Sequence, residues 1–164
     1  MEAFLISTGS VALAEIGDKT QLLALVLAAR HRQPVPIILG ILVATLANHT
    51  LAGAIGSWLT SLVAPPTMRW IVGLSFIGMA LWTLMPDEVE PNAVQLSRRS
   101  VFGATLSAFF LTEMGDKTQV ATVPLAAQYP TLLAVVAGAT CGMLLANAPA
   151  VLMGGKIADH LPVR

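Results

Sequence analysis

The stretch E-I-G-D-K-T-Q at residues 15–21 places charged side chains inside an otherwise apolar run, and E-M-G-D-K-T-Q at residues 113–119 repeats it at six of seven positions. A shorter match, L-A-N at residues 46–48 and again at 145–147, lies downstream of each copy. Because charged residues agree in a chain of low complexity, chance is a poor explanation. The chain is therefore built from two related halves.

Outward from these motifs the chain is strongly apolar. Of its 164 residues 55% are apolar and 11% are charged, whereas soluble domains carry about 25% charged residues. A helix needs about 20 mostly apolar residues to cross a bilayer. The stretches that meet this requirement are residues 3–29, 36–62, 68–85, 101–127 and 131–154. We therefore predict an all-α integral membrane protein with five transmembrane helices.

The order of the spans predicts how the halves are related. Three spans precede the second motif, so the second half enters the membrane from the opposite face, which makes an inverted repeat of three-helix units. We predict a first repeat at 1–86, a cytoplasmic linker at 87–100 and a second repeat at 101–164. The second repeat holds two spans only. We expect a sixth helix to be missing at the C-terminus, and the chain to be a truncated form of a six-helix protein.

Lysines and arginines predict the orientation, because they are enriched in cytoplasmic loops. One predicted side has Arg69 alone. The other side has Arg30, Arg32, Arg98, Arg99, Lys156 and Arg164. We therefore expect the N-terminus outside the cell and the linker in the cytoplasm, in a plasma membrane such as the inner membrane of a bacterium.

Composition also excludes several classes of function. The formal net charge is zero, which argues against nucleic acid as a partner. The single cysteine, Cys141, cannot form an internal disulfide. No motif for an organic cofactor is present, and we expect none. The expected partners are the lipid bilayer and small ions, with monomer and homodimer both left open.

The four acids of the motifs are the candidate metal ligands. They are Glu15, Asp18, Glu113 and Asp116. Placing Asp or Lys at mid-bilayer costs at least about 2.5–3.5 kcal/mol, so these groups are expected to converge. On a continuous helix the acids and the lysine of one motif share one face. Four carboxylates and two ammonium groups sum to minus two, which one divalent cation or two protons would neutralise.

Further residues of the motifs and their neighbours are expected to support the site. The lysines limit its net charge, and the hydroxyl and amide groups offer neutral oxygens. These supporting residues are Lys19, Thr20, Gln21, Asn48, Lys117, Thr118, Gln119 and Asn147. Oxygen ligands favour hard ions such as Mn²⁺, Ca²⁺ or Mg²⁺ over copper or zinc. Gly17 and Gly115 either allow helices to approach closely or let the helix bend.

The paired Glu-x-Gly-Asp-(Lys/Arg)-(Ser/Thr) motif resembles that of a small cation/proton antiporter family, which includes bacterial manganese exporters and the Golgi manganese and calcium transporters of eukaryotes. The resemblance covers the whole chain. It implies six helices, an inverted repeat, and Mn²⁺ or Ca²⁺ moved against protons. It also assigns metal and proton binding to the four acids of the two motifs.

We accordingly expect a secondary active transporter that exports Mn²⁺, or alternatively Ca²⁺, from the cytoplasm in exchange for protons, and not an enzyme. Three alternatives stay open at this point. A passive cation channel also uses acidic rings. An intramembrane aspartyl protease also pairs buried aspartates, although here a lysine follows each aspartate. A structural membrane protein would use the charged groups only to hold its helices together.

Overall fold

The computed structural model describes residues 1–83 and 100–157. These residues form seven helices and no strand, which confirms the all-α prediction. The helices are α1 (Glu2–Glu15), α2 (Lys19–His31), α3 (Pro34–Leu62), α4 (Pro65–Thr83), α5 (Val101–Glu113), α6 (Lys117–Gln128) and α7 (Leu132–Ile157). Most of the predicted linker 87–100, with Arg98 and Arg99, and the terminal Arg164 lie outside the described residues.

Two of the predicted spans are broken in the middle. The single helix expected at 3–29 is the pair α1 and α2, and the one expected at 101–127 is the pair α5 and α6. The breaks contain Gly17 with φ +79° and Gly115 with φ +81°. This left-handed conformation interrupts an α-helix, and side chains other than glycine rarely adopt it. The prediction of one continuous helix through each motif is therefore wrong.

The glycines act in the breaks as bends and not as packing devices. A Cβ atom built on Gly17 or on Gly115 would meet no other atom within 4 Å. Neither glycine is therefore needed for a close approach between helices. Of the two roles left open by the sequence, the structure supports the bend.

The other three spans are continuous, and their ends follow the sequence signals. α3 begins at Pro34, where a proline is tolerated because the first amide of a helix has no partner within the helix. It ends at Leu62, as expected, before Ala64-Pro65-Pro66. α4 and α7 differ from their predicted bounds by a few residues at each end.

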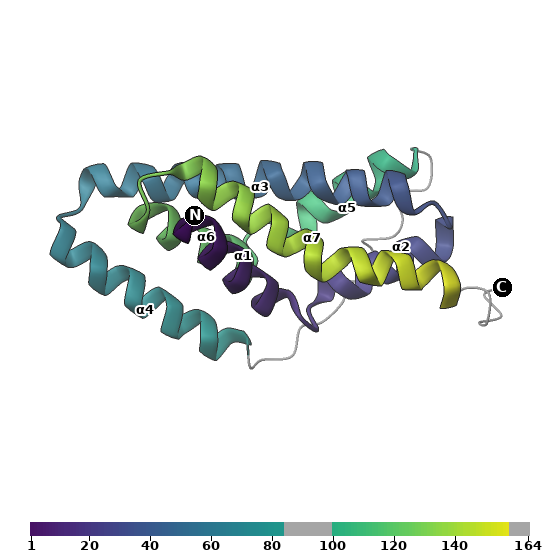
Figure 1. The fold of residues 1–164 in the computed structure, drawn as a ribbon, viewed down its shortest axis with the longest axis horizontal. Helices are drawn as coiled ribbons and strands as arrows, with labels where there is room; N and C mark the ends of the chain where they lie inside the picture. Colours follow the sequence, from purple (N-terminus) through teal and green to yellow (C-terminus); the bar gives the residue numbers. More distant parts are fainter. Residues whose placement is uncertain (84–99, 158–164) are drawn as a thin grey trace.

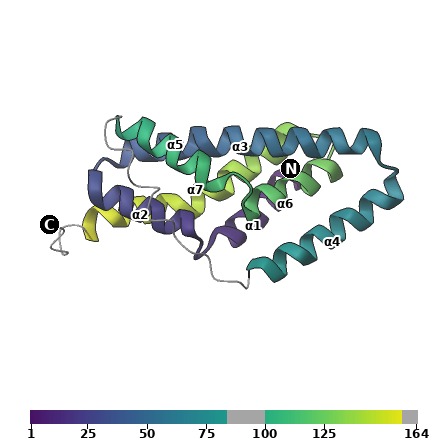
Figure 2. The same cartoon turned by 180° about the vertical axis from the view of Figure 1, so that it is seen from behind.

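Each broken pair packs along a long helix from the other half of the chain. α5 and α6 lie one after the other beside α3, while α1 and α2 lie in the same way along α7 (Figure 1). α3 and α7 also pack against each other, and α4 returns from the end of α3 to pack against α6. The view from behind shows α3 at one edge and α4 opposite, with α1, α6 and α7 between them (Figure 2). The two breaks therefore meet in the middle of the bundle.

Glycines on α7 set the short distance between that helix and the broken pair α1 and α2. A Cβ atom on Gly142 would lie 2.5 Å from the backbone oxygen of Thr8 in α1. A Cβ atom on Gly154 would lie 2.7 Å from the backbone oxygen of Leu25 in α2. Because backbone atoms cannot move aside as a flexible side chain can, both positions require the absence of a side chain.

By length and composition, α3 and α7 are able to cross a membrane. Residues Pro34–Leu62 and Leu132–Gly154 have mean hydropathies of 1.8 and 1.7. No other helix among the described residues passes this test of length and hydropathy. The breaks divide two of the predicted spans into short helices, and α4 is unbroken with 19 residues. The five membrane crossings stay a prediction.

Candidate functional site

Each break has the same local structure, and its sequence explains why. Asp18 is the N-cap residue of α2, and Gln21 is the third residue of that helix; the spacing is that of a capping box, but here the glutamine reaches one residue further back than the N-cap. The Gln21 side-chain oxygen accepts a hydrogen bond of 3.1 Å from the amide of Gly17. Gln119 accepts one of 2.7 Å from the amide of Gly115 in the second motif. The signal for a helix start was therefore present in the sequence, and the continuous-helix prediction overlooked it.

This local structure also shows what the two glutamines contact. The side-chain oxygens of Gln21 and Gln119 were predicted as neutral ligands of the site. In the structure these oxygens accept hydrogen bonds from the backbone amides of Gly17 and Gly115, one residue before each N-cap, and their role as ligands stays a prediction. Gln21 further donates a hydrogen bond of 3.1 Å to the backbone oxygen of Ala146 and so ties the first break to α7.

The four acids of the motifs occupy two kinds of position. Glu15 and Glu113 are the last residues of α1 and α5, whereas Asp18 and Asp116 are the N-cap residues of α2 and α6. All four are buried, with 0 to 3% of their surface exposed. A helix carries partial positive charge at its N-terminus and partial negative charge at its C-terminus. The aspartates therefore lie where the helix favours an anion, and the glutamates where it disfavours one.

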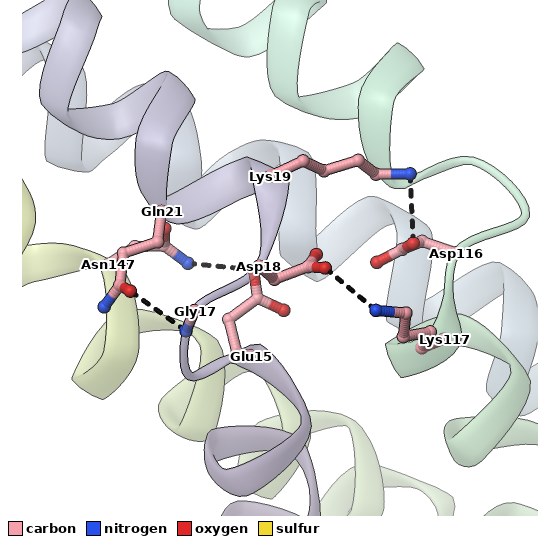
Figure 3. Close-up of polar contacts among 8 residues, drawn as sticks. All are labelled: Glu15, Gly17, Asp18, Lys19, Gln21, Asp116, Lys117 and Asn147. Carbon is pink, nitrogen blue, oxygen red and sulfur yellow. Dashed lines mark hydrogen bonds and ion pairs between the residues drawn. The ribbon is translucent and has the colours of Figure 1, made fainter. Parts of the chain in front are cut away.

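The two lysines pair with the aspartate of the opposite motif. Lys19 Nζ lies 3.1 Å from Asp116 Oδ1, and Lys117 Nζ lies 3.2 Å from Asp18 Oδ1. Figure 3 shows these two contacts running in opposite directions between the breaks. The Lys117 side chain is 4% exposed and that of Lys19 is 26% exposed. The breaks are thus joined by two crossed ion pairs, which sequence spacing alone did not reveal.

Two asparagines cross between the halves in the same way. Asn48 on α3 donates hydrogen bonds to Glu113 Oε2 at 3.4 Å and to the backbone oxygen of Phe110 at 3.1 Å. Asn147 on α7 donates to Glu15 Oε1 at 3.4 Å and to the backbone oxygen of Met143 at 3.1 Å. Each amide therefore holds the carboxylate of the other half against its own helix.

Three of the four acids are close enough to share one ion. Glu15, Asp18 and Asp116 each offer an oxygen, and these oxygens lie within 4.8 Å of one another. Figure 3 shows Asp18 at the first break and Asp116 at the second break pointing toward each other, with Glu15 below Asp18. Glu113 is outside this group, although it lies near enough to interact electrostatically with the other three acids. Of the four predicted ligands, three therefore form one compact group, and Glu113 lies outside it.

Several buried oxygens around these acids have no hydrogen-bond partner among the described residues. They are Glu15 Oε2, Glu113 Oε1, Asp116 Oδ2, Asn48 Oδ1, Asn147 Oδ1 and Thr20 Oγ1. Buried polar atoms are normally paired, because leaving one unpaired costs its full desolvation energy. The carboxylate and amide oxygens of this set are acceptors only. Thr118, another of the predicted supporting residues, is also buried. Its backbone oxygen accepts a hydrogen bond from the Thr122 hydroxyl.

Comparison with known proteins shows which family this chain belongs to. The family model described as "Divalent cation/proton antiporter GDT1" matches residues 3–91 and 101–164. The chain therefore belongs to the GDT1 family of divalent cation/proton antiporters, which are transporters and not enzymes. The resemblance proposed from the two motifs is confirmed, and the aspartyl protease is excluded.

Individual relatives cover most of the chain. A Vibrio cholerae protein named "Putative manganese exporter" is 49% identical over 164 residues, which is 99% of this chain and 82% of that protein. Rice "GDT1-like protein 4" is 26% identical and is covered over 66% of its length. The Arabidopsis thaliana "Protein PAM71-homolog, chloroplastic" is 28% identical and is covered over 50% of its length. No solved structure is significantly similar to this chain.

Proposed function

We propose that this protein spans a plasma membrane and exports Mn²⁺ from the cytoplasm in exchange for protons, with Ca²⁺ as the alternative substrate. The observation that carries the proposal is the convergence of two interrupted helices on one buried cluster of acids. Three of these acids share a space small enough for one ion, and the fourth lies beside them. Membership of an antiporter family supports the same reading.

The surface of the bundle supports a position in the membrane. Large apolar side chains point outward on helices of both halves, for example Leu13 at 71% exposure, Trp70 at 74% and Leu133 at 81%. Water would disfavour this much apolar surface, whereas lipid does not. Charged groups inside a bilayer are tolerated where they face protein and not lipid, and the acidic side chains at both breaks are buried in the bundle.

Charge explains why the site would exchange a divalent ion for protons. Four carboxylates against two ammonium groups leave a deficit of two positive charges among buried residues. Glu15 and Glu113 add to the need for a cation, because each lies at the negative end of a helix. One divalent ion fills the deficit, and so do two protons. Binding of one therefore favours release of the other.

The ligands favour a hard divalent ion. Carboxylate oxygens from Glu15, Asp18 and Asp116 lie closest together, and the amide oxygens of Asn48 and Asn147 are buried without a partner among the described residues. Such oxygen sites suit Mn²⁺, Ca²⁺ and Mg²⁺. We choose Mn²⁺ because the Vibrio relative carries the name of a manganese exporter.

The matched contacts of the halves suggest how the site would open to each side in turn. Two kinds of contact between the halves occur in pairs: Lys19–Asp116 matches Lys117–Asp18, and the Asn48–Glu113 hydrogen bond matches Asn147–Glu15. In an inverted repeat such equivalent contacts allow one half to take the conformation of the other, so that the site faces each side alternately. With the N-terminus outside, protons entering from that side would drive Mn²⁺ outward.

A flux assay tests this proposal. The purified protein is placed in sealed lipid vesicles, and Mn²⁺ accumulation is followed while a proton gradient is imposed. We expect Mn²⁺ to move against its own gradient only while the proton gradient lasts. Flux that runs only downhill and ignores the proton gradient would indicate a channel instead.

Matched variants assign the transport to the site. Glu15→Gln and Glu113→Gln each remove one carboxylate from the cluster, and we expect both to abolish exchange. Glu2→Gln makes the same chemical change at the exposed start of α1 and should leave exchange intact. Normal exchange by both cluster variants would exclude the assigned role.

A further inference from the structure

The crossed lysines place two ammonium groups at the oxygens that would bind the transported ion. Lys19 follows Asp18 in the chain, yet its ammonium contacts Asp116 at 3.1 Å. Lys117 follows Asp116, yet its ammonium contacts Asp18 at 3.2 Å. Both aspartates belong to the group whose oxygens lie within 4.8 Å of one another. Each ammonium therefore occupies one binding direction of a candidate ligand.

An ammonium group and a metal ion compete for such a carboxylate. Both are cations that need its electron pairs, and both repel each other when bound to the same group. The lysine chain is a flexible stem of four carbons that ends in a point charge. It can withdraw from the aspartate without moving the backbone, and it can return afterwards.

We propose that Lys19 and Lys117 are tethered cations that compete with the transported ion for Asp116 and Asp18 and thereby enable its release. This inference rests on the proposed function and assigns a further role within the same site. A metal ion displaces an ammonium when it binds. The returning ammonium lowers the affinity again, while the protons taken up in exchange fill the charge deficit that the departing ion leaves.

The competition predicts opposite effects on affinity and turnover. Lys19→Met and Lys117→Met remove the competitor and keep much of the side-chain volume. We expect each to tighten Mn²⁺ binding about tenfold, a value within the range of measured couplings between contacting charges. Turnover in vesicles should fall at least as much, because release has become slow. A purely structural salt bridge would lower both quantities together.

Arginine variants make the test independent of the loss of charge. A guanidinium at position 19 or 117 keeps the positive charge and binds a carboxylate with two parallel hydrogen bonds. It is therefore a stronger competitor than the ammonium. Lys19→Arg should weaken Mn²⁺ binding about tenfold, opposite to the effect of Lys19→Met. Arg69→Met removes a charge from α4 and serves as the control, with no expected change in affinity.

A double-mutant cycle tests the crossing itself. In a background of Asp116→Asn, Lys19→Met should no longer change the affinity, while Lys117→Met should still tighten it. Mn²⁺ binding is measured by electron paramagnetic resonance on folded protein, with thermal unfolding as the check on folding. If a methionine variant does not fold, the arginine variant at that position decides the question.

The outcomes separate the two proposals. Unchanged or weaker Mn²⁺ binding by folded Lys19→Met and Lys117→Met overturns the competition and leaves the proposed function standing. A wild-type protein that binds neither Mn²⁺ nor Ca²⁺ overturns the proposed function and the competition with it. Tighter binding together with slower turnover supports both.

Discussion

Asn147 on α7 donates a hydrogen bond of 3.4 Å to the carboxylate of Glu15, the last residue of α1. The two residues are 132 positions apart in the chain and belong to different halves of the duplicated sequence. The same amide nitrogen also donates to the backbone oxygen of Met143. Asn147 is thereby fixed on its own helix, and it directs one oxygen of Glu15.

This contact predicts that Asn147 positions a ligand. Asn147→Ala removes the donor and frees the Glu15 carboxylate to turn, so Mn²⁺ affinity should fall about ten- to hundredfold, as is usual for residues that orient ligands. The direct measurement is Mn²⁺ binding to purified protein. Asn48→Ala removes the equivalent contact with Glu113 and should act in the same direction. Wild-type affinity in both variants would contradict the positioning role.

The positive φ angles of Gly17 and Gly115 predict that replacing either glycine lowers the stability of the protein even where no steric clash results. Gly17→Ala and Gly115→Ala introduce a side chain at φ near +80°, where no neighbouring atom is within 4 Å. Each substitution should lower the free energy of unfolding by about 1–2 kcal/mol through backbone strain alone. Thermal unfolding in detergent measures the effect.

Gly9 provides the control for this strain. It lies within α1, its φ is not positive, and a Cβ atom added to it would also meet no other atom within 4 Å. Gly9→Ala should therefore raise the free energy of unfolding by up to about 1 kcal/mol, because alanine favours the helix. Equal effects at Gly9 and Gly17 would show that the break is not a strained left-handed turn.

Close packing of α7 predicts a second, steric effect. Gly142→Ala places a methyl group 2.5 Å from the backbone oxygen of Thr8, so α1 and α7 must move apart. Overpacking of this kind costs about 1–3 kcal/mol. Gly73→Ala on α4, where nothing lies within 4 Å, is the matched control and should cost less than Gly142→Ala. Thermal unfolding of the two variants, compared side by side, decides the point.

Competition between metal and protons predicts the sign of the pH dependence. Both ligands neutralise the same carboxylates, so Mn²⁺ binding should release protons and should weaken as the pH falls. Calorimetric titration in buffers of different ionisation heat counts the protons released per ion. The charge deficit of the site leads us to expect a count near two, and a count of zero would exclude direct competition.

The sequence was sufficient for several parts of this fold and site. Long apolar runs predicted an all-helical chain, and the span predicted at 36–62 differs from α3 only in its start at Pro34. The repeated motif identified the four acids that the structure places in and around one buried cluster. These conclusions depend on local composition and on repetition, which can be read without knowing how the helices pack.

The two helix breaks were within reach of the sequence but were overlooked. Gly17 followed by Asp18 combines a helix-ending residue with a favoured N-cap residue for the next helix. The length and apolar character of the surrounding run suggested one continuous helix instead. The consequence is specific, since Glu15 and Asp18 lie at the ends of two different helices and not on one helical face.

Duplication, the apolar spans and the buried acids were determined by the order of residues along the chain alone. Only the tertiary structure decided that Lys19 joins Asp116 rather than its own motif, and that Asn48 and Asn147 each hold the glutamate of the other half. The physical reason is that helical spacing defines which residues share a face, whereas partners on separate helices depend on how α3 and α7 bring the two breaks together.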